Sequence, residues 1–271
     1  MLKHILINIS GKETINSSSS FPTECVCFFD EFEEIIDLIK TKNLLKEEII
    51  IISDSVLIIS QAISQNFCTI GYEYNDISFS SLNTSLILSF DGISYSYLDS
   101  VLCHHFNKPW TLSDTSELII IEPTLDDFNS IYQMYFGDAG VKNNYLLNYM
   151  NLDYMSEKER FISYINLQFK FYGYGLYNVV HKEKDDIVGQ CGLYNDNDNN
   201  LCISYYIKPA YRKNNIAYNS CMAIIEYAKT ELCAKKIYAH IYDENLASIN
   251  LAKKLGFEYQ AHGLYVLYLN K

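Results

Sequence analysis

The sequence contains no apolar run long enough to cross a lipid bilayer. Its longest apolar stretch, residues 49–63, is interrupted by Ser53, Asp54 and Ser55, whereas a membrane helix needs about 20 consecutive apolar residues. The first ten residues carry one lysine and a short apolar run without a small-residue cleavage site, so no secretory signal is predicted. We therefore expect a soluble, cytoplasmic protein that has no membrane partner.

The chain also lacks the cysteine spacings of a disulfide framework or a zinc motif. None of its eight cysteines forms a C-x-x-C pair, and the closest two are Cys25 and Cys27. The run Cys103-His104-His105 has no further ligand pattern nearby. We therefore expect reduced thiols, as is usual in the cytosol, and no metal site.

Basic residues are scarce relative to acidic ones: 21 Lys and Arg stand against 33 Asp and Glu, and the net charge is −12. Proteins that bind nucleic acids neutralise phosphates with Lys and Arg, so no nucleic-acid partner is expected. The acidic balance is compatible with a cationic substrate such as an amine. The hydrophobic fraction of 49% over 271 residues is sufficient for one large domain or two of ordinary size.

Residues 1–113 are predicted to form a smaller, Rossmann-like α/β domain to which the sequence assigns no role. Apolar strands alternate with amphipathic helices, which favours an open, mostly parallel sheet with helices on its faces. A polar turn is expected at residues 16–20. The expected strands are residues 4–9, 26–29, 48–53, 67–70 and 86–90, and the expected helices are residues 31–41, 56–65 and 95–106.

The domain boundary is predicted at residues 107–114, where Pro109 stiffens the chain beside Trp110, the only tryptophan. Residues 114–271 then form the second domain. Its second helix is expected to open with a Ser156–Glu159 capping box. The expected helices are residues 125–135, 156–169 and a helix starting near Ile216, and the expected strands are residues 117–121, 175–180, 187–193, 201–207, 236–243 and 263–269.

The most informative stretch is residues 201–218, which predicts a strand, a turn and a helix. Pro209 cannot donate to a strand ladder, so the strand ends before it. Apolar residues then recur with the helical period from Ile216 onward. Such a junction aims unpaired backbone N–H groups and the positive end of a helix dipole at one point. This arrangement predicts an anion site, most naturally for phosphate.

The turn resembles the (Q/R)-x-x-G-x-(G/A) pattern with which the GNAT acetyltransferase superfamily binds the pyrophosphate of acetyl-coenzyme A (acetyl-CoA). Asn215 stands where the pattern has glycine, and Asn tolerates a positive φ better than most other residues. The six residues of this turn are Arg212, Lys213, Asn214, Asn215, Ile216 and Ala217.

A second stretch resembles the N-x-A-S…K-L-G-F signature of the same superfamily, which packs beside the adenosine and pantetheine arm. Asn245-Leu246-Ala247-Ser248 follows an expected strand, and the next helix ends in Lys254-Leu255-Gly256-Phe257. Ser248 suits an N-terminal cap, and Gly256 suits a helix stop.

The resemblance covers residues 117–271 and looks most like the ribosomal-protein alanine acetyltransferase branch. It implies a GNAT fold with a splayed, mostly antiparallel sheet. It also implies transfer of an acetyl group from acetyl-CoA to an amine, on a small molecule or a peptide N-terminus, by direct attack on the thioester. The cofactor-binding residues that it implies are Tyr206, Ile207, Arg212, Lys213, Asn214, Asn215, Ile216, Ala217, Tyr218, Asn245 and Ser248.

The sequence departs from its relatives at three positions that usually handle protons. Two usual glutamates fall at Cys202 and Asn219, and the usual tyrosine falls at Ala252. The remaining catalytic candidates are Tyr205 and His240 on the two splayed strands, together with the carboxylates at positions 243 and 244. The alternative is a catalytically quiet CoA-binding module that serves sensing or scaffolding for the first domain.

Overall fold

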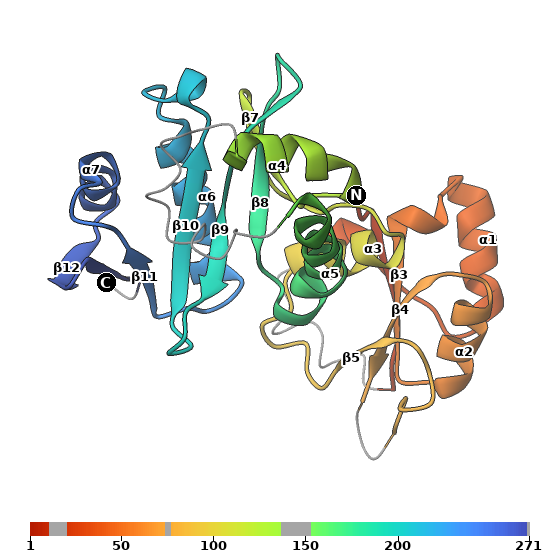
Figure 1. The fold of residues 1–271 in the computed structure, drawn as a ribbon. Helices are drawn as coiled ribbons and strands as arrows, with labels where there is room; N and C mark the ends of the chain where they lie inside the picture. Colours follow the sequence, from red (N-terminus) through yellow and green to blue (C-terminus); the bar gives the residue numbers. More distant parts are fainter. Residues whose placement is uncertain (11–20, 74–76, 137–152, 270–271) are drawn as a thin grey trace. The chain divides into compact units, whose positions relative to one another are not determined.

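The computed structural model describes residues 1–10, 21–73, 77–136 and 153–269 (Figure 1). The chain divides into two compact units, Met1–Trp110 and Thr111–Lys271. The polar turn expected at residues 16–20 lies outside the described residues. Within the described ranges, no helix is both long and apolar enough to cross a membrane.

The first unit contains a five-stranded sheet in the order β2-β1-β3-β4-β5. All neighbouring strands are parallel, which confirms the expected α/β class. The strands are β1 (His4–Asn8), β2 (Val26–Phe28), β3 (Ile49–Ser53), β4 (Cys68–Tyr72) and β5 (Ser85–Ile87), and the helices are α1 (Phe32–Lys42), α2 (Val56–Ser64) and α3 (Tyr95–His105).

Helices cover both faces of this sheet because the central strand is apolar on both sides. Ile50 and Ile52 of β3 pack in one cluster with Leu98 of α3. Ile49 and Ile51 pack in a second cluster with residues of α1 and α2. All residues of β3 are buried, as expected for a parallel strand enclosed by helices. The fifth strand is shorter than the expected residues 86–90 and begins one residue earlier.

The second unit contains an eight-stranded sheet in the order β12-β13-β11-β10-β9-β8-β7-β6. Its neighbouring strands are antiparallel except for the central pair β10 and β11, which is parallel. The strands are β6 (Thr111–Asp114), β7 (Leu118–Ile121), β8 (Leu176–His181), β9 (Asp186–Asn195), β10 (Leu201–Ile207), β11 (Lys236–His240), β12 (Glu258–Ala261) and β13 (Leu264–Tyr268).

Two strands of this sheet were not expected from the sequence. Strand β6 lies within the predicted boundary segment, and β12 lies between the last helix and the last expected strand. None of the residues of either strand is buried. Neither strand buries one of its faces, so neither segment shows the apolar alternation that identifies a half-buried strand. Each joins the sheet by pairing with a neighbouring strand.

Helices lie on both faces of the second sheet, and β9 shows how the faces alternate. Gln190 accepts a hydrogen bond from Tyr135 of one helix, at 2.8 Å, whereas the Cys191 sulfur lies 3.8 Å from that of Cys221 in another. Cys221 belongs to helix α6, which runs behind β9 and β10 in Figure 1. The helices are α4 (Phe128–Phe136), α5 (Tyr154–Tyr172), α6 (Ile216–Thr230) and α7 (Leu246–Lys254).

Two helix caps differ from the sequence prediction. The N-cap of α5 is Asp153, which accepts hydrogen bonds from the Met155 and Ser156 N–H groups, so the Ser156–Glu159 capping box is wrong. The N-cap of α7 is Asn245.

The prediction that Ser248 is the N-terminal cap of α7 is wrong. The Ser248 N–H donates to Asn245 Oδ1 at 3.1 Å, so Ser248 is the residue that is capped. At the other end, Gly256 has φ +90, and the Phe257 N–H donates to Ala252 O at 2.9 Å. This left-handed ending confirms Gly256 as the helix stop.

Asn245→Ala removes the acceptor of the Ser248 N–H and should lower the local free energy of unfolding of α7 by about 1 kcal/mol. Ser248→Ala keeps that hydrogen bond and should change the local free energy of unfolding of α7 by less than about 0.5 kcal/mol. Hydrogen exchange of the α7 amides in the full-length protein measures both. Equal losses in the two variants would contradict the cap assignment.

Candidate functional site

The junction between β10 and α6 has the strand, turn and helix that the sequence predicts. Strand β10 ends at Ile207, and Pro209 opens a short 3-10 turn, Pro209–Tyr211. Helix α6 starts at Ile216. Buried residues spaced along α6, including Cys221 and Ile224, hold it against β9 and β10. The first turn of α6 is therefore fixed at the carboxyl end of β10.

The turn before α6 adopts the backbone that its asparagine favours. Asn215 is the N-cap residue and has φ 57 and ψ 7, in the left-handed region. Asn reaches this region at lower cost than other non-glycine residues, so the glycine of the family pattern can be replaced here. The Asn215 side chain makes no capping hydrogen bond. The N–H groups of the first turn of α6 therefore point at the site without a side-chain cap.

Strands β10 and β11 separate soon after they meet. Their register contains one pair of Cα partners, Cys202 and Tyr238. The Lys208 N–H donates to Val188 O of β9 at 2.8 Å. Because successive N–H groups along a strand point to opposite edges, the Ile207 N–H points toward the β11 side. The strand expected at residues 236–243 ends earlier, at His240.

A cavity of about 700 Å³ occupies this gap. Its walls come from β10, the turn, the start of α6, the end of β11 and helix α7. The cavity brings together twelve of the thirteen site residues predicted from the sequence; Asn214 does not line it. The twelve are Tyr205, Tyr206, Ile207, Arg212, Lys213, Asn215, Ile216, Ala217, Tyr218, His240, Asn245 and Ser248.

Basic side chains gather around the start of α6. Arg212 Nε donates to Ile207 O at 2.9 Å, and its guanidinium lies 5.6 Å from the centre of the Tyr206 ring. Lys254 Nζ lies 3.3 Å from Asn215 Oδ1 and 4.1 Å from the centre of the Tyr218 ring. The sequence identified Lys254 only as part of a helix end. Its position beside the turn follows from the place of the last residue of α7 next to the start of α6.

Tyr205 of β10 lines the cavity with its hydroxyl buried beside Ser248. Burial raises the pKa of Tyr205, and the contact with Ser248 opposes this rise only in part. That contact falls short of hydrogen-bond geometry. The hydroxyl therefore keeps its proton at neutral pH and can donate it in a hydrogen bond to a ligand.

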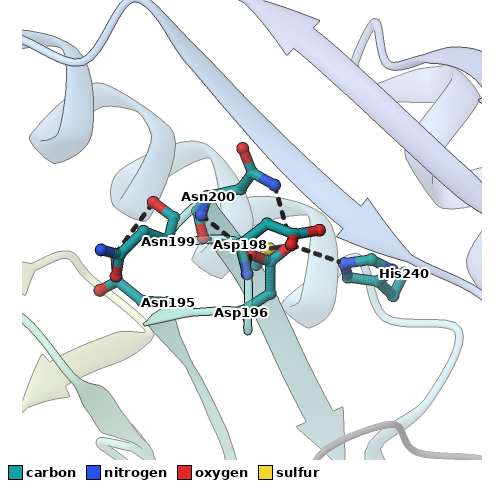
Figure 2. Close-up of polar contacts among 7 residues, drawn as sticks. Asn195, Asp196, Asp198, Asn199, Asn200 and His240 are labelled. Atoms are coloured by element: carbon teal, nitrogen blue, oxygen red, sulfur yellow. Dashed lines mark hydrogen bonds and ion pairs between the residues drawn. The ribbon is translucent and has the colours of Figure 1, made fainter.

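His240 lies at the end of β11, and Figure 2 shows its ring pointing toward Asp196. The two groups are 3.1 Å apart, between His240 Nε2 and Asp196 Oδ2. Burial acts to raise the pKa of Asp196, but hydrogen bonds from Asn200, His240 and Asp198 outweigh it and lower that pKa to about 2. An ionised carboxylate therefore orients the imidazole, as in many acid–base sites.

Sequence reasoning did not identify Asp196. Residues 195–200 are polar, and no local pattern in them marks a turn residue that meets another strand. Of the two remaining carboxylate candidates, Glu244 lines the cavity and Asp243 does not. Ala252, at the position of the usual tyrosine, also lines it.

Comparison with solved structures identifies the fold of the second unit. A probable acetyltransferase has a TM-score of 0.51 at 16% identity, over 59% of this chain and 98% of the other. A GNAT-family acetyltransferase from Bordetella pertussis has a TM-score of 0.48 at 18% identity, over 57% and 95%. The ribosomal α-N-protein acetyltransferase RimL in complex with coenzyme A has a TM-score of 0.46 at 14% identity, over 59% and 98%. No curated protein sequence matches the chain significantly.

The likeness to the first of these structures shows a shared fold, in which the sheet separates between β10 and β11 beside the cavity. The model of the acetyltransferase (GNAT) domain family matches residues 117–258, slightly more than half of the chain. The chain therefore belongs to the GNAT acetyltransferase family, which confirms the resemblance of its two motifs. It is an acetyltransferase that depends on acetyl-CoA.

Asp196→Asn tests the ionised carboxylate through the pH dependence of stability. The pKa of about 2 lies below the ordinary value of about 3.9, so ionised Asp196 stabilises the folded protein above about pH 4. This contribution is lost as the pH falls toward 2. The difference in unfolding free energy between wild type and Asp196→Asn should therefore shrink from about pH 5 to about pH 2.5. Urea unfolding across this range measures it.

The exposed Asp198→Asn, in the same turn, is the matched control for loss of one charge. A wild-type advantage over Asp196→Asn that stays constant with pH would show that the carboxylate is not stabilised in its ionised form.

Proposed function

We propose that the protein transfers the acetyl group of acetyl-CoA to a primary amine, on a small molecule or a peptide N-terminus, by direct attack of the amine on the thioester. The separation of β10 and β11 carries this proposal. It leaves a cavity of about 700 Å³ beside the Ile207 N–H and the start of α6. An acetyl-CoA site needs an anion-binding group for the pyrophosphate, a contact for the pantetheine arm and a donor to the oxyanion, and groups suited to all three line this cavity. The anion-binding group, at the start of α6, is called the cradle below.

The start of α6 suits the pyrophosphate. Its first-turn N–H groups have no side-chain cap, and the positive end of the helix dipole lies there. Arg212, Lys213 and Lys254 add positive charge around the same point, in a protein whose net charge is −12. This local reversal of sign supports binding of a phosphate group rather than of a neutral ligand.

The start of α7 suits the pantetheine arm, and the end of β10 suits the thioester. Asn245 Oδ1 is engaged by the Ser248 N–H, which fixes the side chain and leaves Nδ2 as the donor to the arm. The Ile207 N–H points into the gap and can donate to the thioester oxygen as it gains charge. One such donor contributes about 3 kcal/mol to acyl transfer in comparable sites.

His240 and Tyr205 are the groups that handle protons in this proposal. The amine must first lose one proton to solvent, because its ordinary pKa is about 10 and the ammonium form has no free electron pair. As the neutral nitrogen bonds to the carbonyl carbon, His240, oriented by Asp196, accepts the second proton that the nitrogen gives up. The C–S bond then breaks, and Tyr205 donates a hydrogen bond to the departing thiolate, which takes its proton from solvent. The raised pKa of Tyr205 suits this role of donor better than that of a base.

Asn215→Glu places a negative charge in the cradle and should weaken CoA binding by at least about 100-fold, because two charges about 5 Å apart repel by about 3 kcal/mol at an effective dielectric constant of about 20. Asn215→Gln has the same shape and the same backbone strain without the charge. It should keep the affinity within about threefold of wild type, about 0.7 kcal/mol. Isothermal titration with CoA measures all three proteins. Equal affinity of the Glu and Gln variants would show that the cradle is misassigned.

Free-thiol release from acetyl-CoA across a panel of amines tests the activity. At least one amine should raise release well above hydrolysis. His240→Gln should then lower kcat by roughly 100-fold or more, as loss of a general base does. Tyr205→Phe should lower kcat by about tenfold, for the loss of about 1.4 kcal/mol. Both variants should keep their affinity for CoA.

The exposed His262→Asn is the matched control, because His262 has φ 49, which Asn tolerates. If wild type binds CoA and no amine raises thiol release, the catalytically quiet CoA-binding module is the better interpretation. If His240→Gln retains full activity, the proton is handled elsewhere.

A further inference from the structure

A second cluster of reactive side chains lies at the other end of β10. It consists of Asp196 from the β9–β10 turn, Cys202 from β10 and His240 from the end of β11. Asp196 Oδ2 lies 3.1 Å from His240 Nε2 and 3.6 Å from the Cys202 sulfur. One ligand atom from each residue lies within 4.8 Å of the others. Cys103, His104 and His105, which are adjacent in the sequence, form no such group in the part of the chain that the structure describes.

Two of the three separations are close to those between ligands of one tetrahedral ion, and the third, between the Cys202 sulfur and the His240 ring nitrogen, is at most 4.8 Å. Zinc lies about 2.0–2.2 Å from nitrogen and oxygen ligands and about 2.3 Å from sulfur, so neighbouring ligands are about 3.4 Å apart for N and O and about 3.6 Å for S and O. The observed distances are 3.1 Å between Nε2 and Oδ2 and 3.6 Å between Sγ and Oδ2. Small side-chain shifts suffice to admit an ion.

The turn holds the carboxylate in the orientation that a ligand needs. Asp196 Oδ1 accepts the N–H groups of Asp198 at 3.0 Å and Asn200 at 2.9 Å, and Figure 2 shows the turn closing around it. The Asn200 side chain donates to Oδ2 at 3.2 Å. These contacts leave Oδ2 facing the other two ligands. Outer contacts of this kind are what orient the ligands of protein metal sites.

The chemistry of the three donors selects the class of ion. A sulfur, an imidazole nitrogen and one carboxylate oxygen favour zinc and its neighbours over magnesium or calcium, which prefer oxygen ligands. Cys202 is fully buried, whereas the side chains of Asp196 and His240 are 10% and 22% exposed. The exposed side gives an ion a route in and leaves a fourth position for water, as in open zinc sites.

We propose that Asp196, Cys202 and His240 form a binding site for one divalent transition-metal ion of the zinc class. The sulfur carries a proton in the metal-free protein, because burial and the Asp196 carboxylate raise the pKa of Cys202 to about 12. That proton leaves to solvent when the sulfur coordinates the ion. The proposal does not rest on the proposed acetyl transfer, although His240 serves both. A metal on Nε2 replaces the proton that Asp196 accepts there, so acetyl transfer is assayed on protein treated with a chelator.

Cobalt titration of chelator-treated full-length protein tests the site without acetyl-CoA. One equivalent of Co²⁺ should give the visible bands of a tetrahedral ion and a near-ultraviolet thiolate-to-cobalt band, and Zn²⁺ should abolish both. Cys202→Ser should lose the thiolate band. His240→Gln and Asp196→Asn should weaken binding by more than the roughly 10- to 100-fold cost of losing an outer contact.

The matched controls are Cys233→Ser and His262→Asn, both at exposed positions away from the cluster. They should bind like wild type. Circular dichroism identifies any variant that does not fold, and the partly exposed His240 gives a second test if Cys202→Ser is unstable. The proposal is overturned if wild type shows no thiolate band, or if the band persists in folded Cys202→Ser or at undiminished affinity in His240→Gln. Because CoA is absent, neither result bears on acetyl transfer.

Discussion

The site depends on one limited pairing between two parallel strands in the middle of a sheet that is otherwise antiparallel. Strands β10 and β11 share a single register pair, at Cys202 and Tyr238, and then separate. Elsewhere a broken ladder would leave backbone groups without partners, which is unfavourable in a protein interior. Here the separation leaves the cavity, and the longer ladders of β9 with β10 and of β11 with β13 hold each strand on its outer side.

The helix that follows β10 turns this opening into an anion site. Its buried face, with Cys221 and Ile224, fixes its direction against the sheet. Lys213 and Asn215 both have positive φ and bend the chain sharply into its first turn. The N–H groups of that turn are therefore held in place before any ligand arrives, which reduces the ordering that binding requires.

The two ends of β10 carry different chemistry. The Ile207 end opens into the cavity, and the Cys202 end meets Asp196 and His240. The sequence shows an acidic residue missing at position 202, relative to the family pattern. In the structure a carboxylate from another element lies beside this position, because Asp196 Oδ2 is 3.6 Å from the Cys202 sulfur. His240 connects the two ends, since it lines the cavity and contacts Asp196.

The sequence by itself determined the strong periodic elements and the cofactor turn. Buried parallel strands such as Ile49–Ser53 are continuous apolar runs, and Pro209 and Asn215 encode the end of β10 and the start of α6 through their own backbone preferences. Local signals of this kind do not depend on distant contacts. The sequence did not predict strands β6 and β12, because none of their residues is buried and each strand forms only by pairing with a neighbouring strand.

The tertiary structure decided the rest, because it depends on which side chains meet across elements. Asn245 rather than Ser248 caps α7, Lys254 lies over the turn, and Asp196 faces His240 from 44 residues away in the chain. No spacing in the sequence encodes such a meeting, since the relevant distance is set by the sheet order and the packing of helices upon it.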